Sequence, residues 1–168
     1  MRKLHWIIMG ALACAQREVA IMTPYFIPDR PLVAALVTAA LRDVKVTLVL
    51  PAKNNLPYVH WATRAYLWEL LQQGIRVYYQ PPPFVHTKML LVDGVWSLIG
   101  SANLDPRSLR LNFELNMEVY DAPFCHELNA EFNTTVLASR EVTLEEMDAR
   151  SLPEKLRDGA AKLFSPYL

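Results

Sequence analysis

The chain has 168 residues, of which 52% are hydrophobic and 20% are charged, and its 17 basic side chains balance 17 acidic ones. This composition excludes a disordered chain and predicts one domain over residues 1–168 with a substantial core. The charge balance disfavours a nucleic-acid binder, which is more often basic, so no nucleic-acid partner is expected. Cys14 and Cys125 provide neither a disulfide framework nor a zinc spacing.

The N-terminal residues allow two interpretations. A basic start followed by the apolar run 6–15 resembles a signal peptide. That run is about half of the roughly 20 residues that a membrane span needs. An amphipathic helix is favoured, because apolar residues recur at helical spacing. No transmembrane segment is expected, so any membrane contact would be peripheral.

Strands and helices alternate along the first half of the chain. The patterns predict strands at 19–22, 44–50 and 75–79, and helices at 31–41 and 58–73. In the second half, apolar runs at 84–92 and 95–99 flank Asp93-Gly94, which is a strong hairpin signal. A strand at 114–120 and helices at 123–137 and 153–164 follow. This order predicts an α/β fold, with a mixed sheet flanked by helices on both faces as an α/β/α sandwich.

One stretch concentrates the chemistry. His86 and Lys88 are followed by four apolar residues, Asp93, and then Gly-Ser-Ala-Asn at 100–103. The other three histidines lack a lysine two positions on, so the pattern occurs once. An imidazole, a fixed cation and several hydrogen-bond donors together suit attack on a phosphodiester.

The predicted hairpin gathers these side chains. If Asp93-Gly94 is a two-residue turn, His86 lies opposite Ser101, with Cβ atoms roughly 4.5–5.5 Å apart. Lys88 shares the strand face of His86 because side chains alternate. Asp93 lies in the turn, where bonding nearby backbone is a better interpretation than catalysis.

Each residue type suggests a role. Lys88, Ser101 and Asn103 can hold phosphate oxygens, while the imidazole of His86 can attack phosphorus. The far imidazole nitrogen needs an acceptor, and Glu114 on the next predicted strand is a candidate. No ligand cluster suggests a metal, so no metal or cofactor is expected and the lysine supplies the positive charge.

Simpler interpretations compete with these roles. A lone histidine near an apolar strand is usually structural, but Lys88 and the Gly-Ser-x-Asn segment favour a functional His86. Glu114 alone could be a solvated strand residue. Asp105, Arg107 and Arg110 are interpreted as surface charges rather than substrate contacts.

The motif resembles the HKD signature of the phospholipase D superfamily: H-x-K-x4-D at 86–93, then G-S-x-N at 100–103. Other segments are similar to bacterial cardiolipin synthases, namely TPYFIPD at 23–29, NLDPRS at 103–108 and LNFE at 111–114. The resemblance runs from about residue 5 to 165. It implies a phospholipase D-like lobe and a phosphohistidine mechanism that uses two HKD motifs.

The resemblance also implies roles and a reaction. His86, Lys88 and Glu114 would be catalytic, with Glu114 orienting His86; Ser101 and Asn103 would bind phosphate, and Asp93 would be a structural motif member. The implied reaction is phosphatidyl transfer between phosphatidylglycerol molecules, peripherally at the cytoplasmic face of the bacterial membrane. Hydrolysis by a phospholipase D or a small nuclease is the alternative.

The chain departs from two-lobed cardiolipin synthases because it resembles only their C-terminal lobe and carries one motif. Three cases stay open: a homodimer that pairs two His86 residues, a fragment whose partner lobe is missing, or an inactive truncated product. Whether His86 is the nucleophile or the general acid also stays open.

Overall fold

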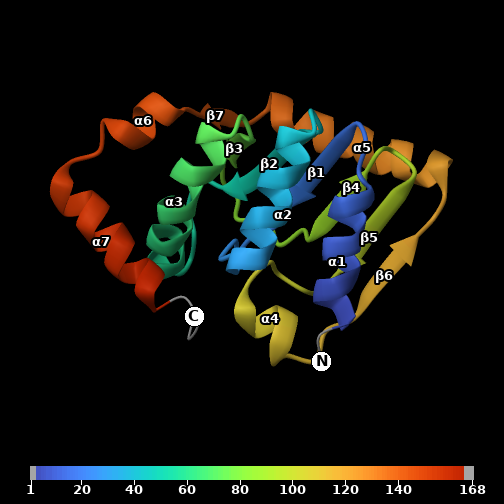
Figure 1. Cartoon of the computed structure of the whole chain (residues 1–168), viewed down its shortest axis with the longest axis horizontal. Helices are drawn as coiled ribbons and strands as arrows, with labels where there is room; N and C mark the ends of the chain where they lie inside the picture. The colour runs from blue at the N-terminus through green and yellow to red at the C-terminus, as the bar shows by residue number, and fades with distance from the viewer. Residues whose placement is uncertain (1–2, 165–168) are drawn as a thin grey trace.

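The computed structural model describes residues 3–164 and is built on a mixed sheet (Figure 1). Its described strands lie in the order β6-β5-β4-β1-β2-β3-β7. β1, β2 and β3 are parallel, and the other strands join this centre through antiparallel pairs. The strands are β1 (Glu18–Met22), β2 (Lys45–Pro51), β3 (Arg76–Gln80), β4 (Met89–Val92), β5 (Trp96–Gly100), β6 (Asn116–Val119) and β7 (Arg140–Val142).

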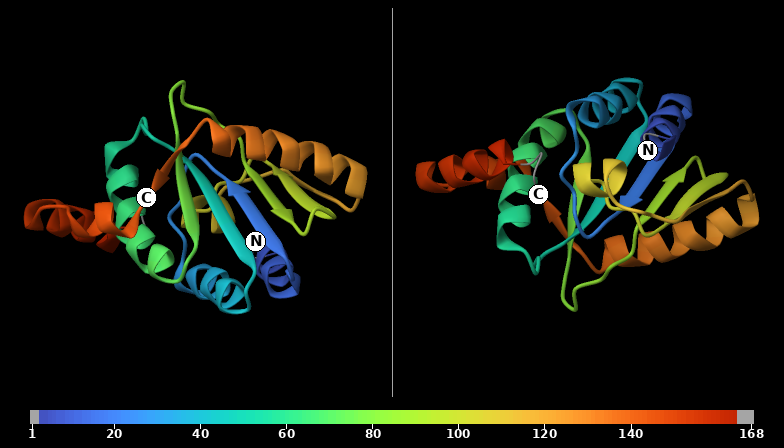
Figure 2. Two further views of the ribbon diagram at one scale, coloured as in Figure 1. Left: turned by 90° about the horizontal axis from the view of Figure 1, so that it is seen from above. Right: turned by 90° about the horizontal axis from the view of Figure 1, so that it is seen from below.

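Helices cover both faces of the sheet (Figure 2). α1 (Lys3–Cys14), α2 (Arg30–Leu41) and α3 (Pro57–Gln72) pack on one face, and α5 (Ala122–Leu137) crosses the other. α4 (Pro106–Arg110) and α6 (Leu144–Asp148) are short, and α7 (Leu152–Leu163) packs outside α3. The predicted sandwich with helices on both faces is confirmed.

The central strands are apolar on both faces, which explains why the sequence shows continuous apolar runs there. Ile21 and Leu48 belong to the large core beneath α1–α3. Their neighbours Met22 and Val49 belong to a smaller core beneath Phe132 of α5. Side chains alternate along a strand, so each strand supplies both cores.

Most predicted elements are confirmed within a few residues. Pro31 lies in the first turn of α2, and Gly74 follows α3 with a φ of 76°. Three short elements escaped prediction, namely α4, α6 and β7. Their patterns are too short to show a period.

The predicted hairpin register is wrong by one residue. Val92 pairs with Trp96, so Val95 is an extra residue on the β5 side of the turn. Asp93 and Gly94 both have positive φ, 55° and 69°, as expected for a tight turn. The register that places His86 opposite Ser101 therefore does not form.

The first of the two apolar runs is also shorter than predicted as a strand. β4 begins at Met89, and residues 84–88 form a loop. His86 and Lys88 consequently do not share a strand face, because alternation applies only to extended, paired backbone.

Candidate active site

His86 lies on the exposed loop that leads into β4. Its ring meets the rings of Phe84 and Tyr25 edge-on, with centroids 4.8 Å and 6.2 Å away. Tyr25 follows β1, and its hydroxyl donates to Asn55 Oδ1 at 2.8 Å. Two aromatic rings therefore position the imidazole while leaving it open to solvent.

Lys88 is half-buried just before β4. Its Nζ donates to the backbone oxygen of His86 at 2.7 Å. Burial lowers the pKa of Lys88, while the nearby carboxylates of Glu114 and Asp105 act in the opposite direction. The ammonium thus connects the His86 loop with the acidic groups of the neighbouring segments.

Ser101 and Glu114 form the best-defined pair of the site. Ser101 Oγ donates to Glu114 Oε2 at 2.5 Å and accepts from the Leu115 amide at 3.0 Å. The other Glu114 oxygen accepts from Asn112 Nδ2 at 3.2 Å. A Cβ atom at Gly100 would collide with the backbone of the segment that carries this glutamate. Glycine at position 100 therefore lets the two segments meet.

Asn103 lies where two distant segments join. The Ile27 amide donates to the Leu104 oxygen at 2.9 Å, which ties the stretch after β1 to the stretch after β5. Asn103 Nδ2 donates to Ser108 Oγ at 3.3 Å, and its Oδ1 is buried without a described partner. The carboxamide is held on one side and has acceptor capacity left on the other.

Asp105 is not the surface charge that was predicted. It is 7% exposed and caps α4, with Oδ1 accepting from the Ser108 amide at 2.8 Å. Burial raises the pKa of Asp105, amide hydrogen bonds oppose the shift, and the charge of Glu114 adds to it. Arg110 is exposed as expected, but it also binds Asp29 at 2.8 Å.

A hollow of about 330 Å³ opens beside Asn103. Tyr25, Tyr58, Arg107 and Asn112 also line it. The sequence arguments interpreted Arg107 as a surface charge and assigned no role to the other three residues. Their membership in the TPYFIPD, NLDPRS and LNFE segments was the available signal for three of them, and Tyr58 had none.

Asp93 lies at the other end of β4. Its carboxylate accepts from the amides of Gln16, Arg17 and Glu18 at 2.8–2.9 Å. Burial alone would raise the pKa of Asp93, but these hydrogen bonds and the Arg17 charge hold it below its ordinary value. The expectation of a turn residue that binds backbone agrees with this geometry.

The structure therefore gathers Lys88, Ser101, Asn103 and Glu114, with His86 attached through its backbone oxygen. None of the hydrogen bonds described for residues 3–164 joins Glu114 to the imidazole of His86. The orienting role of Glu114 stays a prediction. Within the same residues, no group of three potential metal ligands is found.

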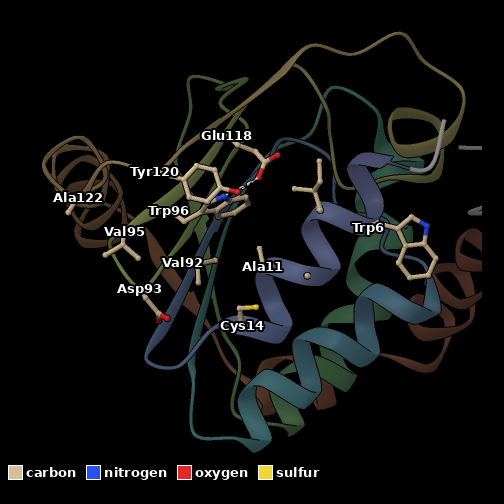
Figure 3. Close-up of a pocket in the computed structure, with 12 residues that line it drawn as sticks. Trp6, Ala11, Cys14, Val92, Asp93, Val95, Trp96, Glu118, Tyr120 and Ala122 are labelled. Atoms are coloured by element: carbon tan, nitrogen blue, oxygen red, sulfur yellow. Dashed lines mark hydrogen bonds between the residues drawn. The ribbon is translucent and has the colours of Figure 1, made fainter.

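A larger hollow lies elsewhere, between α1 and the β5–β6 edge (Figure 3). It measures about 790 Å³ and is lined mainly by apolar side chains, including Trp6, Ala11 and Trp96. Of the motif residues, it touches only Asp93. In the described part of the chain, no helix has the length and apolar character required to cross a bilayer.

Known proteins are similar to this chain in sequence. A family model described as "Cardiolipin synthase, PLD-like domain" matches residues 8–136. Cardiolipin synthase 1 of Staphylococcus epidermidis is 39% identical over 98% of this chain and 34% of its own length. Major cardiolipin synthase ClsA of Bacillus subtilis is 40% identical over 92% of this chain and 32% of its own. The chain spans about a third of these relatives.

Two solved structures share the fold. Nuc of Salmonella typhimurium, a phospholipase D family member, has a TM-score of 0.73 at 20% identity and covers 83% of this chain and 90% of its own. Phosphatidylserine synthase of Haemophilus influenzae has a TM-score of 0.78 at 18% identity and covers 98% and 44%. The predicted phospholipase D-like fold is confirmed.

Proposed function

Because the chain belongs to the family of cardiolipin synthase PLD-like domains, we propose that it is one catalytic lobe of a cardiolipin-synthase-type phosphatidyltransferase. One observation carries the proposal. His86 is exposed on the loop before β4, and its backbone oxygen accepts a hydrogen bond from Lys88 Nζ. The Ser101–Glu114 pair lies on the neighbouring segments. These groups would supply a nucleophile, a cation and, once the Ser101 hydroxyl turns away from Glu114, a neutral donor to one phosphate.

In the first half of the reaction, an imidazole nitrogen attacks the phosphorus of phosphatidylglycerol. The bond between phosphorus and the glycerol oxygen breaks, and a second histidine gives its proton to the departing glycerol. A phosphatidyl-histidine remains. Lys88 and Asn103 would hold the non-bridging oxygens, where charge gathers in the transition state.

In the second half, a hydroxyl of another phosphatidylglycerol attacks the phosphatidyl-histidine. Its proton returns to the second histidine, and the phosphorus–nitrogen bond breaks to release cardiolipin and restore His86. The sequence carries one H-x-K-x4-D motif. A second lobe must therefore supply the other histidine, either another copy of the chain or a separate N-terminal half.

Glu114 is proposed as the positioning residue for His86. Its partners in the structure are Ser101 and Asn112, so Glu114 would have to exchange one of them to accept a hydrogen bond from the imidazole. The lipid substrate places the reaction at a membrane surface. We propose peripheral attachment at the cytoplasmic face.

The test is to incubate the purified chain with phosphatidylglycerol in detergent, alone and with a separately made N-terminal lobe. Cardiolipin and glycerol are the expected products, together with an acid-labile phosphate adduct that His86→Ala removes. Formation of phosphatidic acid without cardiolipin would indicate that the chain hydrolyses the lipid instead of transferring the phosphatidyl group. The absence of any product in both mixtures would contradict the proposal.

A further inference from the structure

Helix α7 is turned the opposite way from an ordinary surface helix. A surface helix buries its apolar stripe and exposes its polar face. In α7 the buried residue is Asp158, which is 1% exposed. Leu152, Leu156 and Leu163 are 69%, 65% and 79% exposed. The apolar side of α7 therefore faces away from the protein.

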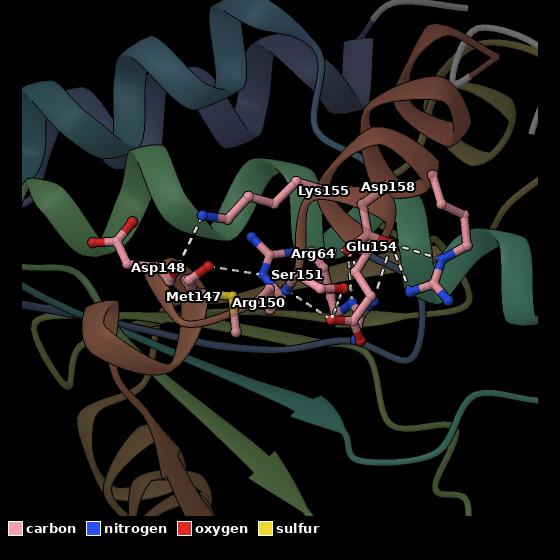
Figure 4. A network of polar contacts seen from close by, with 9 residues as sticks. Arg64, Met147, Asp148, Arg150, Ser151, Glu154, Lys155 and Asp158 are labelled. Carbon is pink, nitrogen blue, oxygen red and sulfur yellow. Dashed lines mark hydrogen bonds and ion pairs between the residues drawn. The ribbon is translucent and has the colours of Figure 1, made fainter.

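Ion pairs fix this orientation (Figure 4). Both Asp158 oxygens accept from Arg64 at 3.0 Å, and Arg150 and Arg157 bind the same carboxylate at 2.7 Å and 3.1 Å. Arg64 and Arg150 are themselves mostly buried. Turning α7 to bury its leucines would leave these cations without their partner, which is strongly unfavourable.

The outward face has one chemical character. Leu152, Leu156 and Leu163 lie one above another because residues at these helical spacings share a face. Gly159 and Ala160 lie beside them and are also exposed. The two acidic residues of α7 lie toward the protein, where Asp158 is buried and Glu154 caps the helix through Ser151.

Cations border this apolar face on both sides. Helical periodicity places Lys155 and Lys162 along one border and Arg157 along the other. Lys162 Nζ lies 4.2 Å from the centre of the Tyr66 ring, and Arg157 lies 4.7 Å from the centre of the Trp61 ring. Leucines flanked by cations are typical of a helix that lies in the interface of an anionic membrane.

The apolar face also continues toward the active site. A hollow of about 350 Å³ between α3 and α7 is lined by Trp61, Ala161, Phe164 and Tyr58. Tyr58 also lines the hollow beside Asn103. In Figure 1 the carboxyl end of α7 lies on the same side of the molecule as α4. Tyr58 thus links the hollow beside α7 to the hollow beside Asn103.

We propose that the outward face of α7 docks the protein onto anionic phospholipid bilayers, with the leucines among the acyl chains and the bordering cations at lipid phosphates. This inference rests on the proposed function, because that function makes an anionic lipid the substrate. Docking through α7 would then hold the Tyr58 edge against the lipid that the site must extract.

The test compares two matched double variants of the full chain. L156Q/L163Q removes two outward leucines of α7. L41Q/L137Q removes two leucines that are 70% and 88% exposed at the ends of α2 and α5. Binding is measured by sedimentation with vesicles of phosphatidylglycerol and phosphatidylcholine, and with phosphatidylcholine alone. We expect L156Q/L163Q to lower partitioning to the anionic vesicles at least about 10-fold, with the control within about 2-fold.

Three outcomes would overturn the proposal: a wild-type chain that does not bind anionic vesicles, equal binding by both variants, or an L156Q/L163Q variant that loses self-association in lipid-free buffer instead. The last would assign the face to a second protein copy. Cardiolipin formation in detergent separates the two proposals. L156Q/L163Q keeps that activity if α7 only docks, while a wild-type chain that binds vesicles without forming product contradicts the proposed function alone.

Discussion

The two ends of strand β4 are built in opposite ways, although one short motif spans both. At the carboxyl end, the Asp93 carboxylate accepts from three backbone amides, and the Asp93 backbone oxygen accepts from Arg17 Nη2 at 2.5 Å. At the amino end, His86 is exposed on a loop and Lys88 is half-buried. Five residue-to-residue steps along extended backbone separate Lys88 from Asp93 by roughly 16 Å. The motif therefore joins a chemical end, which carries the candidate catalytic residues His86 and Lys88, to an anchoring end, which carries Asp93.

The difference gives a structural reason for the four-residue spacing between Lys88 and Asp93 in this chain. The four intervening residues form β4, and all four are buried in the sheet. A tightly anchored Asp93 sets the register of β4 against β1, and that register determines where the His86 loop emerges. The carboxylate can thus be required in the motif without touching a substrate.

The largest expected effect is at the chemical end. His86→Asn removes the proposed catalytic imidazole, and it should lower cardiolipin formation at least about 10³-fold in the proposed two-lobe assembly. Because His86 is exposed, the free energy of unfolding should change by less than about 0.5 kcal/mol. His126→Asn, the same substitution on an exposed position of α5, is the control for both measurements. A large loss of stability in His86→Asn would make its role structural.

Lys88 should show the next largest effect. Lys88→Met removes the charge that is proposed to bind the phosphate, and it should lower the rate about 10²–10³-fold. Since burial lowers the pKa of Lys88, activity should fall on the alkaline side at a pH below that of an ordinary lysine. Lys88→Arg keeps its charge at high pH, so any residual activity should lose this alkaline decline. An unchanged pH profile in Lys88→Arg would show that another group titrates.

Residue types predicted the chemical end, and turn chemistry predicted the anchoring end. The register of the hairpin that contains β4 was not predicted correctly. Asp93-Gly94 makes the turn, yet Val95 adds a residue to the β5 side. A dipeptide turn signal cannot reveal that the Asp93 carboxylate is also held by amides 75–77 positions away. Register depends on such contacts as well as on the turn.

The same limit applies to Asp105, whose predicted position on the surface is wrong. Asp105 looked like a surface charge because its partner amides belong to a helix of five residues, too short to show periodicity. The orientation of α7 was hidden for a different reason. Its helical pattern was clear, but Arg64 meets Asp158 across 94 positions, and this ion pair decides which face is outward. Local patterns predict helices and strands, while long-range ion pairs determine which face of a helix packs against the protein.

The smallest effect on activity, and the most diagnostic one, is expected at Asp93. Asp93→Asn keeps a residue that tolerates the left-handed φ of 55° but removes the charge from three amide hydrogen bonds. We expect a loss of about 1.5–3 kcal/mol in the free energy of unfolding at neutral pH, measured with urea. Activity of the folded variant should stay within about 2-fold of wild type. Asp43→Asn is the matched control, because Asp43 has a φ of 63° and no described side-chain hydrogen bond.

The pH dependence sharpens this prediction. The folded pKa of Asp93 lies below its unfolded value, so its contribution is complete above the unfolded pKa of about 3.9 and is lost as pH falls through the folded pKa. The stability gap between wild type and Asp93→Asn should therefore narrow in acid, whereas the gap for Asp43→Asn should not follow that course. A folded Asp93→Asn with full stability and lost activity would instead place this carboxylate in the chemistry, and the two ends of β4 would no longer differ in kind.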